Sequence, residues 1–294
     1  ALKIYQVKPD VLMVNTHELL IVTVGFRILF GTRIIYDVQE NYKENLLHTQ
    51  AFPAGVRHVL AGWVRLKEWI TSLLFHHFLV AEKSYEKELG FIGKRFSVIE
   101  NKAQLPDWFR RTPNPEKLKL IFTGTLAENT GVFRAIDLAK KLHAIEPKIE
   151  LELIGYCAQR STLQRLYQAV KPYPFIHLKG GAQLVPHREV FEAIATANFG
   201  LISYPTLHYL QNKMPTKLYE YLACQLPILL QNNKPWADLI TQFGGGIVLD
   251  FEDNDPQDIL LQMRGGSFYM DKSQSRERLI WAGEEMAFMR SVAD

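Results

Sequence analysis

The chain of 294 residues has few cysteines, little excess charge and no long apolar run. Its two cysteines, Cys157 and Cys224, have no partners at metal-ligand spacing, and two are too few for a disulfide-rich secreted scaffold. A reducing cytoplasm is therefore the expected compartment. The net charge of +3 is too small for the dense basic patch of a nucleic-acid-binding protein, so no nucleic-acid partner is expected.

The longest apolar run, residues 19–30, is interrupted by Arg27 and is shorter than the roughly 20 residues of a membrane-spanning helix. No transmembrane helix is therefore predicted. Hydrophobic residues make up 47% of the chain and charged residues 22%, the balance of a globular protein. The length fits two domains of ordinary size.

Short β-rich runs alternate with longer helical patterns, which is typical of an α/β protein with doubly wound parallel sheets. Many of these runs are continuously apolar, as strands buried on both faces of a parallel sheet are. The predicted strands are 11–15, 33–37, 78–81, 96–99, 118–123, 149–154, 175–178, 199–203, 228–231 and 247–249. The helical stretches between the later strands are 131–145, 159–170, 188–197, 215–224 and 235–242.

A segment with three prolines and a charge cluster, residues 104–117, is the best candidate for a linker. It predicts an N-terminal domain over 1–105 and a C-terminal domain over 106–272, followed by a helical stretch over 273–294. The first domain has only four predicted strands. Either it is small, or the chain begins inside it.

The stretch 212–230, N-K-M-P-T-K-L-Y-E-Y-L-A-C-Q-L-P-I-L-L, combines features of a nucleotide site. Pro215 suits the first turn of a helix. A helix start with free N–H groups and a nearby Lys217 favours a diphosphate, and Glu220, three residues later on the same side, can accept the hydroxyls of a ribose. The alternative is an ordinary surface Lys–Glu pair.

This stretch resembles the donor-site signature of retaining family 4 (group 1) glycosyltransferases, P-x-K-hydrophobic-aromatic-E-Y-x-A-x-G-x-P-V/I. The match covers Pro215, Lys217, Glu220, Tyr221, Ala223 and Pro227, with Gln225 in place of the usual glycine. Weaker resemblances to the same family lie at 34–42, 98–101, 122–126, 153–155, 178–180 and 197–204.

The resemblance implies the GT-B fold, in which two Rossmann-like domains face a cleft. The first would bind the acceptor and the second the nucleotide-sugar donor, with the final helix, in 273–294, crossing back to the first. It also implies that several dozen N-terminal residues are absent. The expected donor-binding residues are Gly124, Thr125, Gly155, Tyr204, Asn212, Pro215, Thr216, Lys217, Leu218 and Glu220, and the expected catalytic ones are Gln39 and Glu40.

The implied reaction moves a sugar from a nucleotide diphosphate to a saccharide or lipid-linked acceptor with retention. No cofactor is expected. No metal is expected either, and the paired histidines His76 and His77 have no acidic or cysteine partners at ligand spacing.

Several positions depart from the family pattern. Asn212 replaces the first of two glutamates, Gln39 replaces a histidine, and Thr125 and Thr130 stand where the family carries the cations that clamp the diphosphate. These departures favour a second hypothesis, a sugar-nucleotide-binding module without catalysis. A nucleotide-sugar epimerase is a third.

Residues 57–78 form an amphipathic stretch that contains Trp63 and Trp69. It fits either a packed domain helix or a helix at a membrane surface, where a lipid-linked acceptor would reside. His17 follows the first predicted strand, so it is either a cleft residue or a surface loop residue.

Overall fold

The computed structural model describes residues 2–48, 52–207, 211–270 and 275–293. The chain forms two compact units, the first comprising Ala1–Asn101 with Ala282–Asp294 and the second Lys102–Trp281. The division falls four residues before the predicted boundary at 105/106. The reason is that residues on both sides of the predicted boundary pack on the second unit, where Ala103 pairs with Ile280 and Phe109 is buried.

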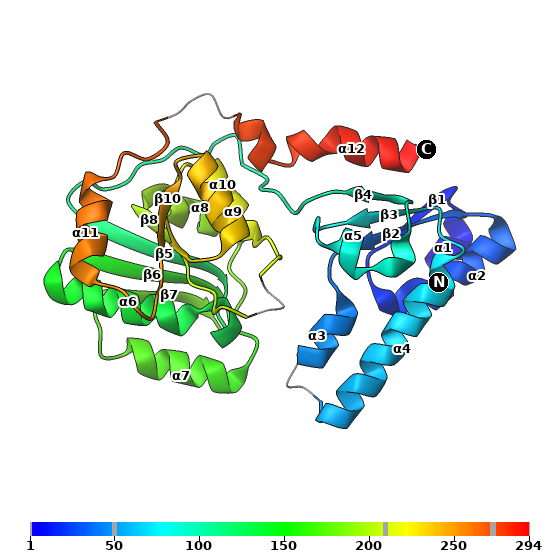
Figure 1. Ribbon diagram of the computed structural model, residues 1–294, viewed down its shortest axis with the longest axis horizontal. Coiled ribbons are helices and arrows are strands. Elements are labelled where there is room, and N and C mark those ends of the chain that lie inside the picture. Colours follow the sequence, from blue (N-terminus) through cyan, green and yellow to red (C-terminus); the bar gives the residue numbers. More distant parts are fainter. Residues whose placement is uncertain (1, 49–51, 208–210, 271–274, 294) are drawn as a thin grey trace. The chain divides into compact units, whose positions relative to one another are not determined.

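The first unit contains a four-stranded parallel sheet whose spatial order follows the chain: β1 (Val11–Val14), β2 (Arg33–Val38), β3 (His77–Val80) and β4 (Phe96–Val98). Buried residues of these strands, among them Ile34, Tyr36 and Phe78, form its core. Its helices are α1 (Leu2–Val7), α2 (Leu20–Phe30), α3 (Tyr42–His48), α4 (Ala54–Ser72), α5 (Tyr85–Glu88) and α12 (Ala282–Ala293) (Figure 1).

The C-terminal stretch predicted as helical over 273–294 contains a short 3-10 helix, Arg276–Leu279, and α12. Residues 273, 274 and 294 lie outside the described residues. α12 belongs to the first unit, where the Ser291 hydroxyl lies 2.9 Å from the Ser97 hydroxyl of β4.

The second unit contains a six-stranded parallel sheet in the order β10-β9-β8-β5-β6-β7. The chain runs outward from β5 (Leu118–Thr125) through β6 (Ile149–Tyr156) to β7 (Ile176–Gly181). It then returns to the other side of β5 with β8 (Phe199–Ile202), β9 (Ile228–Gln231) and β10 (Gly246–Leu249). The strand order therefore reverses between β5 and β8, and doubly wound sheets bind ligands at the carboxyl ends of the strands at such a reversal.

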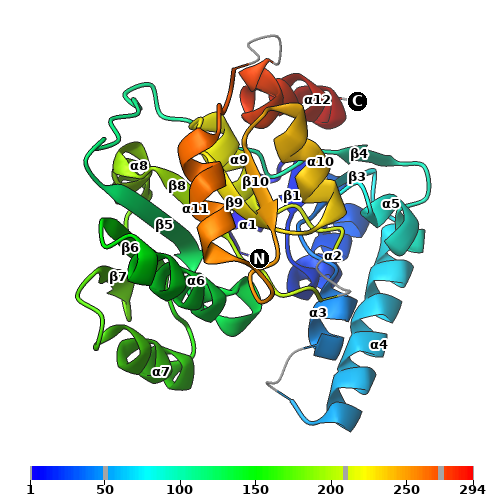
Figure 2. The same ribbon diagram turned by 60° about the vertical axis from the view of Figure 1, so that its left-hand side comes forward.

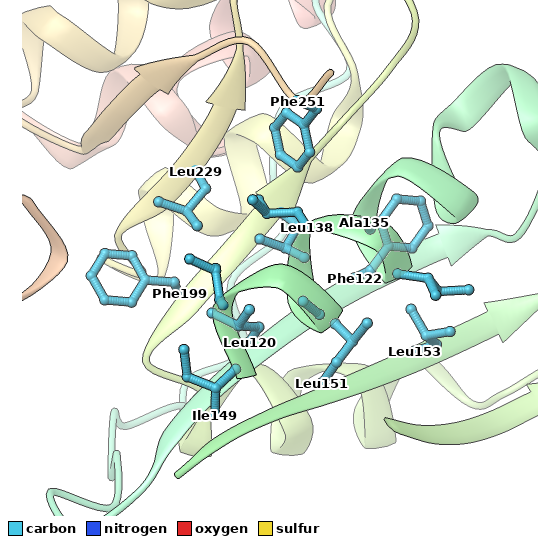
Figure 3. Close-up of a cluster of buried hydrophobic side chains, with 14 of the residues drawn as sticks. Leu120, Phe122, Ala135, Leu138, Ile149, Leu151, Leu153, Phe199, Leu229 and Phe251 are labelled. Carbon is cyan, nitrogen blue, oxygen red and sulfur yellow. The ribbon is translucent and has the colours of Figure 1, made fainter. Parts of the chain in front are cut away.

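Helices cover both faces of this sheet, as Figures 1 and 2 show. One face packs on α6 (Val132–Ile145) and α11 (Pro256–Gly265), and Figure 3 shows this core with Leu120, Leu151 and Leu229 from three strands. The other face packs on α8 (His187–Thr196), α9 (Thr216–Ala223) and α10 (Lys234–Gln242). α7 (Arg160–Val170) flanks β7.

All ten predicted strands are present, with small shifts at their ends. The amphipathic stretch predicted over 57–78 is helical only as far as Ser72. The chain then joins the sheet, because the His76 N–H donates to the carbonyl of Ile34 and β3 begins at His77. His77 is therefore a strand residue, and its Nε2 lies 2.9 Å from the Ser97 hydroxyl.

Candidate functional site

A cavity of about 460 Å³ lies at the carboxyl ends of β5 and β6 and extends to Tyr204 after β8, beside the point between β5 and β8 where the strand order reverses. Its size is within the range of ligand pockets. Seven of the ten expected donor-binding residues line it, which are Gly124, Thr125, Gly155, Tyr204, Thr216, Lys217 and Glu220. The remaining lining residues are Thr123, Tyr156, Leu184, Val185, His187 and Val190.

Bare backbone forms part of the wall of this cavity. Gly124 of β5, Gly155 of β6 and Gly180 of β7 lie side by side in the strand register. A Cβ on Gly155 would lie 1.7 Å from the carbonyl oxygen of Gly124, so no side chain fits there. The glycine keeps the strands together and leaves the space at their ends open for a ligand.

α9 brings the charged residues to the cavity, and Tyr221 fixes this helix to β5. The buried Tyr221 hydroxyl lies 3.0 Å from the Thr123 hydroxyl and accepts a hydrogen bond from the Thr123 N–H at 3.1 Å. The same ring needs a glycine at position 200 of β8, since a Cβ there would come within 2.5 Å of it. The aromatic position of the signature thus holds the helix in place.

Lys217 is an almost fully buried lysine whose ammonium has no hydrogen-bond partner within the described part of the chain. Its Nζ lies 3.9 Å from the centroid of the Phe122 ring and 5.3 Å from that of Tyr204. Burial lowers its pKa to about 7, partly offset by the charge of Glu220. A buried cation that contacts aromatic faces and has no hydrogen-bonded anion is costly, so the site is suited to receive an anion.

Glu220, one turn further along α9, has a partner that sequence reasoning missed. The His187 Nε2–H lies 2.9 Å from Glu220 Oε1. His187 is the first residue of α8, and its ring contacts that of Phe191 with centroids 4.8 Å apart. The hydrogen bond to Glu220 raises the pKa of His187, against the opposing effect of burial. A carboxylate held in this way presents its second oxygen to a ligand.

Three expected donor-binding residues do not line the cavity. Asn212 is exposed in the turn before α9, and Pro215 is the N-cap of this helix. The Leu218 side chain is fully buried in the core, and its N–H donates to the Pro215 carbonyl at 2.9 Å. Leu218 therefore packs the helix, and the Thr216 and Lys217 positions face the cavity.

Thr125 and Thr130 differ in what they do at the turn after β5. Thr125 lines the cavity, whereas the Thr130 hydroxyl donates to the Thr125 carbonyl at 2.7 Å and accepts from the Ala127 N–H. Thr130 therefore stabilises the turn. Gly131, which follows it with a φ of +82°, lies where a Cβ would come 1.8 Å from the Ser203 carbonyl oxygen.

The expected catalytic residues lie in the first unit, after β2. Gln39 Nε2 donates to Asp37 Oδ1 at 2.6 Å, and Glu40 accepts from Asn45. Burial raises the pKa of Asp37. His17, after β1, lies with Nδ1 2.9 Å from Lys67 Nζ. These polar groups share the carboxyl end of the first sheet.

No cluster of three or more histidine, cysteine, aspartate or glutamate side chains suited to a metal ion occurs in the described ranges. One Asp-x-Asp sequence, residues 253–255, lies in the turn before α11. There Asp255 accepts from the Gln257 N–H at 2.9 Å and caps the helix. Among the described helices, none has the length and apolar character needed to cross a membrane.

The family described as glycosyl transferases, group 1, matches residues 106–285. The chain belongs to this family. The matched region contains the whole cavity, from Thr123 to Glu220. No curated protein matches the glycosyltransferase chain in sequence.

Solved structures share its fold at low sequence identity. HepE from Anabaena, in complex with UDP and glucose, matches with a TM-score of 0.70 and 10% identity over 97% of this chain and 78% of its own. Sucrose-phosphate synthase from Thermosynechococcus elongatus matches with a TM-score of 0.71 and 14% identity, over 99% of this chain and 75% of its own. Starch synthase IV from Arabidopsis thaliana, bound to ADP and acarbose, matches with a TM-score of 0.60 and 11% identity, over 99% of this chain and 75% of its own. The glycosyltransferase therefore has the GT-B fold, with two parallel-sheet units.

Proposed function

We propose that the cavity binds the nucleotide diphosphate of a sugar donor. The chain would transfer the sugar to a saccharide or lipid-linked acceptor, with retention and without a metal ion. The second unit would be the donor side and the first the acceptor side. The observation that carries the proposal is the buried ammonium of Lys217, which lines a cavity suited to a ligand but lacks a hydrogen-bond partner among the described residues.

The chemistry of the cavity fits a diphosphate as the leaving group. An ammonium in a poorly solvated site stabilises the charge that develops on the departing phosphate more strongly than it would in water. The start of α9, with Thr216 at the cavity, adds the positive end of a helix. Glu220, oriented by His187, would accept the ribose hydroxyls. Gln39 and Glu40 would orient the transferred sugar or the acceptor by hydrogen bonding.

The solved structures that share the fold were obtained with different nucleotides. HepE was solved with UDP and with UDP-glucose, whereas starch synthase IV was solved with ADP. At sequence identities of 10% and 11%, the nucleotide bound by either protein does not indicate which base this chain prefers. UDP, ADP and GDP therefore belong in one panel.

A second candidate, a sugar-nucleotide-binding module without catalysis, rests on one observation. Lys217 is the only lysine or arginine among the described residues that line the cavity, and the Thr130 hydroxyl is committed to its own turn. A single cation would hold the diphosphate with less leaving-group stabilisation than a clamp of three.

Two measurements test the proposal and separate the candidates. Calorimetry with UDP, GDP and ADP should show binding of at least one. Lys217→Ala should weaken it by about 10- to 150-fold, the loss of one charged hydrogen bond. Lys234→Ala, at an exposed lysine on α10, is the control. An unchanged affinity in Lys217→Ala would refute the site.

Catalysis is then assayed with a panel of nucleotide sugars and acceptors, and the anomeric configuration of the product is read by NMR. A glycoside of retained configuration supports the transferase. Nucleotide binding without turnover of any donor supports the module, and release of an epimerised donor supports an epimerase.

A further inference from the structure

A second cavity, the linker cavity, lies within the second unit and has a volume of about 400 Å³. Its walls are residues 104–108 on one side and three residues of α8, His187, Arg188 and Phe191, on the other. Its volume falls in the range of ligand pockets. Among the described residues that line the two cavities, His187 is the one they share, so the linker cavity adjoins the proposed donor site without being part of it.

The wall at 104–108 belongs to the proline-rich segment that the sequence predicts as a linker, but both of its ends are fixed to the second unit. Just before it, the Ala103 N–H donates to the Leu279 carbonyl at 3.1 Å. Just after it, Phe109 is buried, and its ring centroid lies 5.7 Å from that of Phe191 on α8. The wall is therefore formed before any ligand binds, which reduces the entropy that binding would cost.

Trp108 is the exposed aromatic residue of this wall. The Phe109 N–H donates to the Pro106 carbonyl at 3.0 Å and closes a turn, in which Phe109 is buried while Trp108 keeps 46% of its surface exposed. A single exposed apolar side chain on an open surface needs no explanation. Here, however, a fixed backbone holds the indole in the wall of a cavity, where it offers a ligand a flat apolar surface.

The polar side chains around the indole include both hydrogen-bond donors and acceptors. Asp107 provides a carboxylate and Gln104 an amide. Arg188 provides a guanidinium, whose carbon lies 5.7 Å from the Trp108 ring centroid and whose Nε donates to Glu192 at 3.0 Å. An anionic ligand would meet the Asp107 carboxylate, and a cationic ligand would meet the guanidinium. A hydroxyl group both donates and accepts, so a polyhydroxylated ligand can use all three side chains.

A sugar ring combines the two properties that the linker cavity requires. Its C–H groups form an apolar face that can lie on an indole, and its hydroxyls can bond to carboxylate, amide and guanidinium groups. A nucleoside base could also stack on Trp108, but the phosphates of a nucleotide would need a free cation, and Arg188 is already paired with Glu192.

We propose that the linker cavity binds an uncharged saccharide, with a ring face on Trp108 and hydroxyls on Gln104, Asp107 and Arg188. The site does not depend on nucleotide binding in the other cavity. Combined with the proposed function, it would hold a saccharide on the donor-side unit, next to the His187 that orients Glu220.

The test is ¹⁹F NMR of the full chain labelled with 5-fluorotryptophan, which gives a separate signal for each of the five tryptophans. The signal missing from Trp108→Phe is that of Trp108. Neutral trisaccharides of glucose, mannose, galactose and N-acetylglucosamine are then titrated. At least one should shift the Trp108 signal to saturation and leave the signal of Trp63, an exposed tryptophan of the first unit, in place.

Saturation-transfer NMR then gives the affinity of each variant for that trisaccharide. Trp108→Ala should lower it by about tenfold or more, and Trp108→Phe, which keeps a ring, should lower it less. Trp63→Ala is the matched control and should leave it unchanged. Circular dichroism melting confirms that each variant is folded.

A Trp108 signal that no trisaccharide shifts would overturn the proposal, and so would equal affinities of the wild type and Trp108→Ala. A signal that uridine or adenosine shifts, but no trisaccharide does, would overturn it in favour of a nucleoside site. UDP affinity is measured in parallel, and Trp108→Ala should not change it. Saccharide binding without UDP binding would refute only the donor site, and UDP binding without saccharide binding would refute only this one.

Discussion

His187 Nε2 lies 2.9 Å from Glu220 Oε1, and this contact joins the first residue of α8 to the middle of α9 across the wall of the cavity. The two residues are 33 positions apart in the chain. The sequence predicts a ligand-binding role for Glu220 from the signature, and the structure adds that the carboxylate is oriented by an imidazole before any ligand arrives.

Removing this imidazole should weaken recognition of the ribose. His187→Ala frees the Glu220 carboxylate to rotate, and we expect a roughly three- to tenfold loss of UDP affinity. This loss is smaller than that of a whole charged hydrogen bond, because the carboxylate itself is retained and only its orientation is lost. The preference for UDP over 2′-deoxy-UDP should fall at the same time. Calorimetry with the two nucleotides measures both quantities.

Rescue by a second variant separates orientation from packing. His187→Gln retains an N–H donor and should recover most of the preference, whereas His187→Phe keeps only the contact with Phe191 and should not. If His187→Ala and His187→Phe prefer UDP over 2′-deoxy-UDP as strongly as the wild type does, His187 does not orient Glu220.

Lys217 should destabilise the protein in the absence of ligand, and the penalty should depend on pH. The folded pKa of about 7 lies below the unfolded value, so the unfolded state binds the proton more tightly between these values. The stability of the wild type should therefore rise with pH above 7. Lys217→Met should have an unfolding free energy at least about 2 kcal/mol higher than that of the wild type at pH 6.5. This difference in stability should be smaller at pH 9.

Urea unfolding at the two pH values provides the measurement. If the stability difference between Lys217→Met and the wild type is the same at pH 6.5 and pH 9, the charge of the Lys217 ammonium is not what destabilises the wild type. Lys234→Met, at an exposed lysine, should have the same unfolding free energy as the wild type at both pH values.

The same low pKa predicts proton uptake when a nucleotide diphosphate binds. At pH 8 most of the Lys217 population is neutral, and the phosphate charge should restore the proton. Uptake should approach one proton at pH 8 and vanish near pH 6. Calorimetry in two buffers of different ionisation enthalpy measures it. Lys217→Arg should take up none, because the guanidinium stays charged.

The glycine wall of the cavity should not accept even a methyl group at Gly155. Its Cβ would overlap the Gly124 carbonyl, so Gly155→Ala should cost roughly 2–4 kcal/mol in unfolding free energy, the range of an overpacked core. Gly62→Ala, at a helical position of α4 with open space around it, should instead be neutral or stabilising by up to about 1 kcal/mol. Thermal melting of both variants distinguishes a local overlap from a general sensitivity to alanine.

The strands and the donor-side helices were predictable because their patterns are local. Continuous apolar runs such as 228–230 and 120–122 are typical of buried strands, and a proline followed by an amphipathic stretch marks the start of α9. The signature at 212–230 likewise indicated which side of α9 carries Lys217 and Glu220. Local pattern did not show where the 57–78 helix ends, since that depends on the bond from His76 to Ile34 in a neighbouring strand.

The remaining features of the site depend on contacts between distant residues. His187 follows a proline at the start of a helix, and only the packing of α8 beside α9 brings it to Glu220. Leu218 and Thr130 show the opposite case. Both stand at positions where the family resemblance suggested a ligand contact. In the structure Leu218 is buried in the core, and the Thr130 hydroxyl is hydrogen-bonded within its own turn.

A crystal structure of the protein with UDP would test the central claim most directly. The account predicts the β-phosphate within hydrogen-bonding distance of Lys217 Nζ and the ribose hydroxyls on Glu220, with His187 still bonded to that carboxylate. UDP bound outside this cavity, or bound in it with the phosphates turned away from Lys217, would contradict the account.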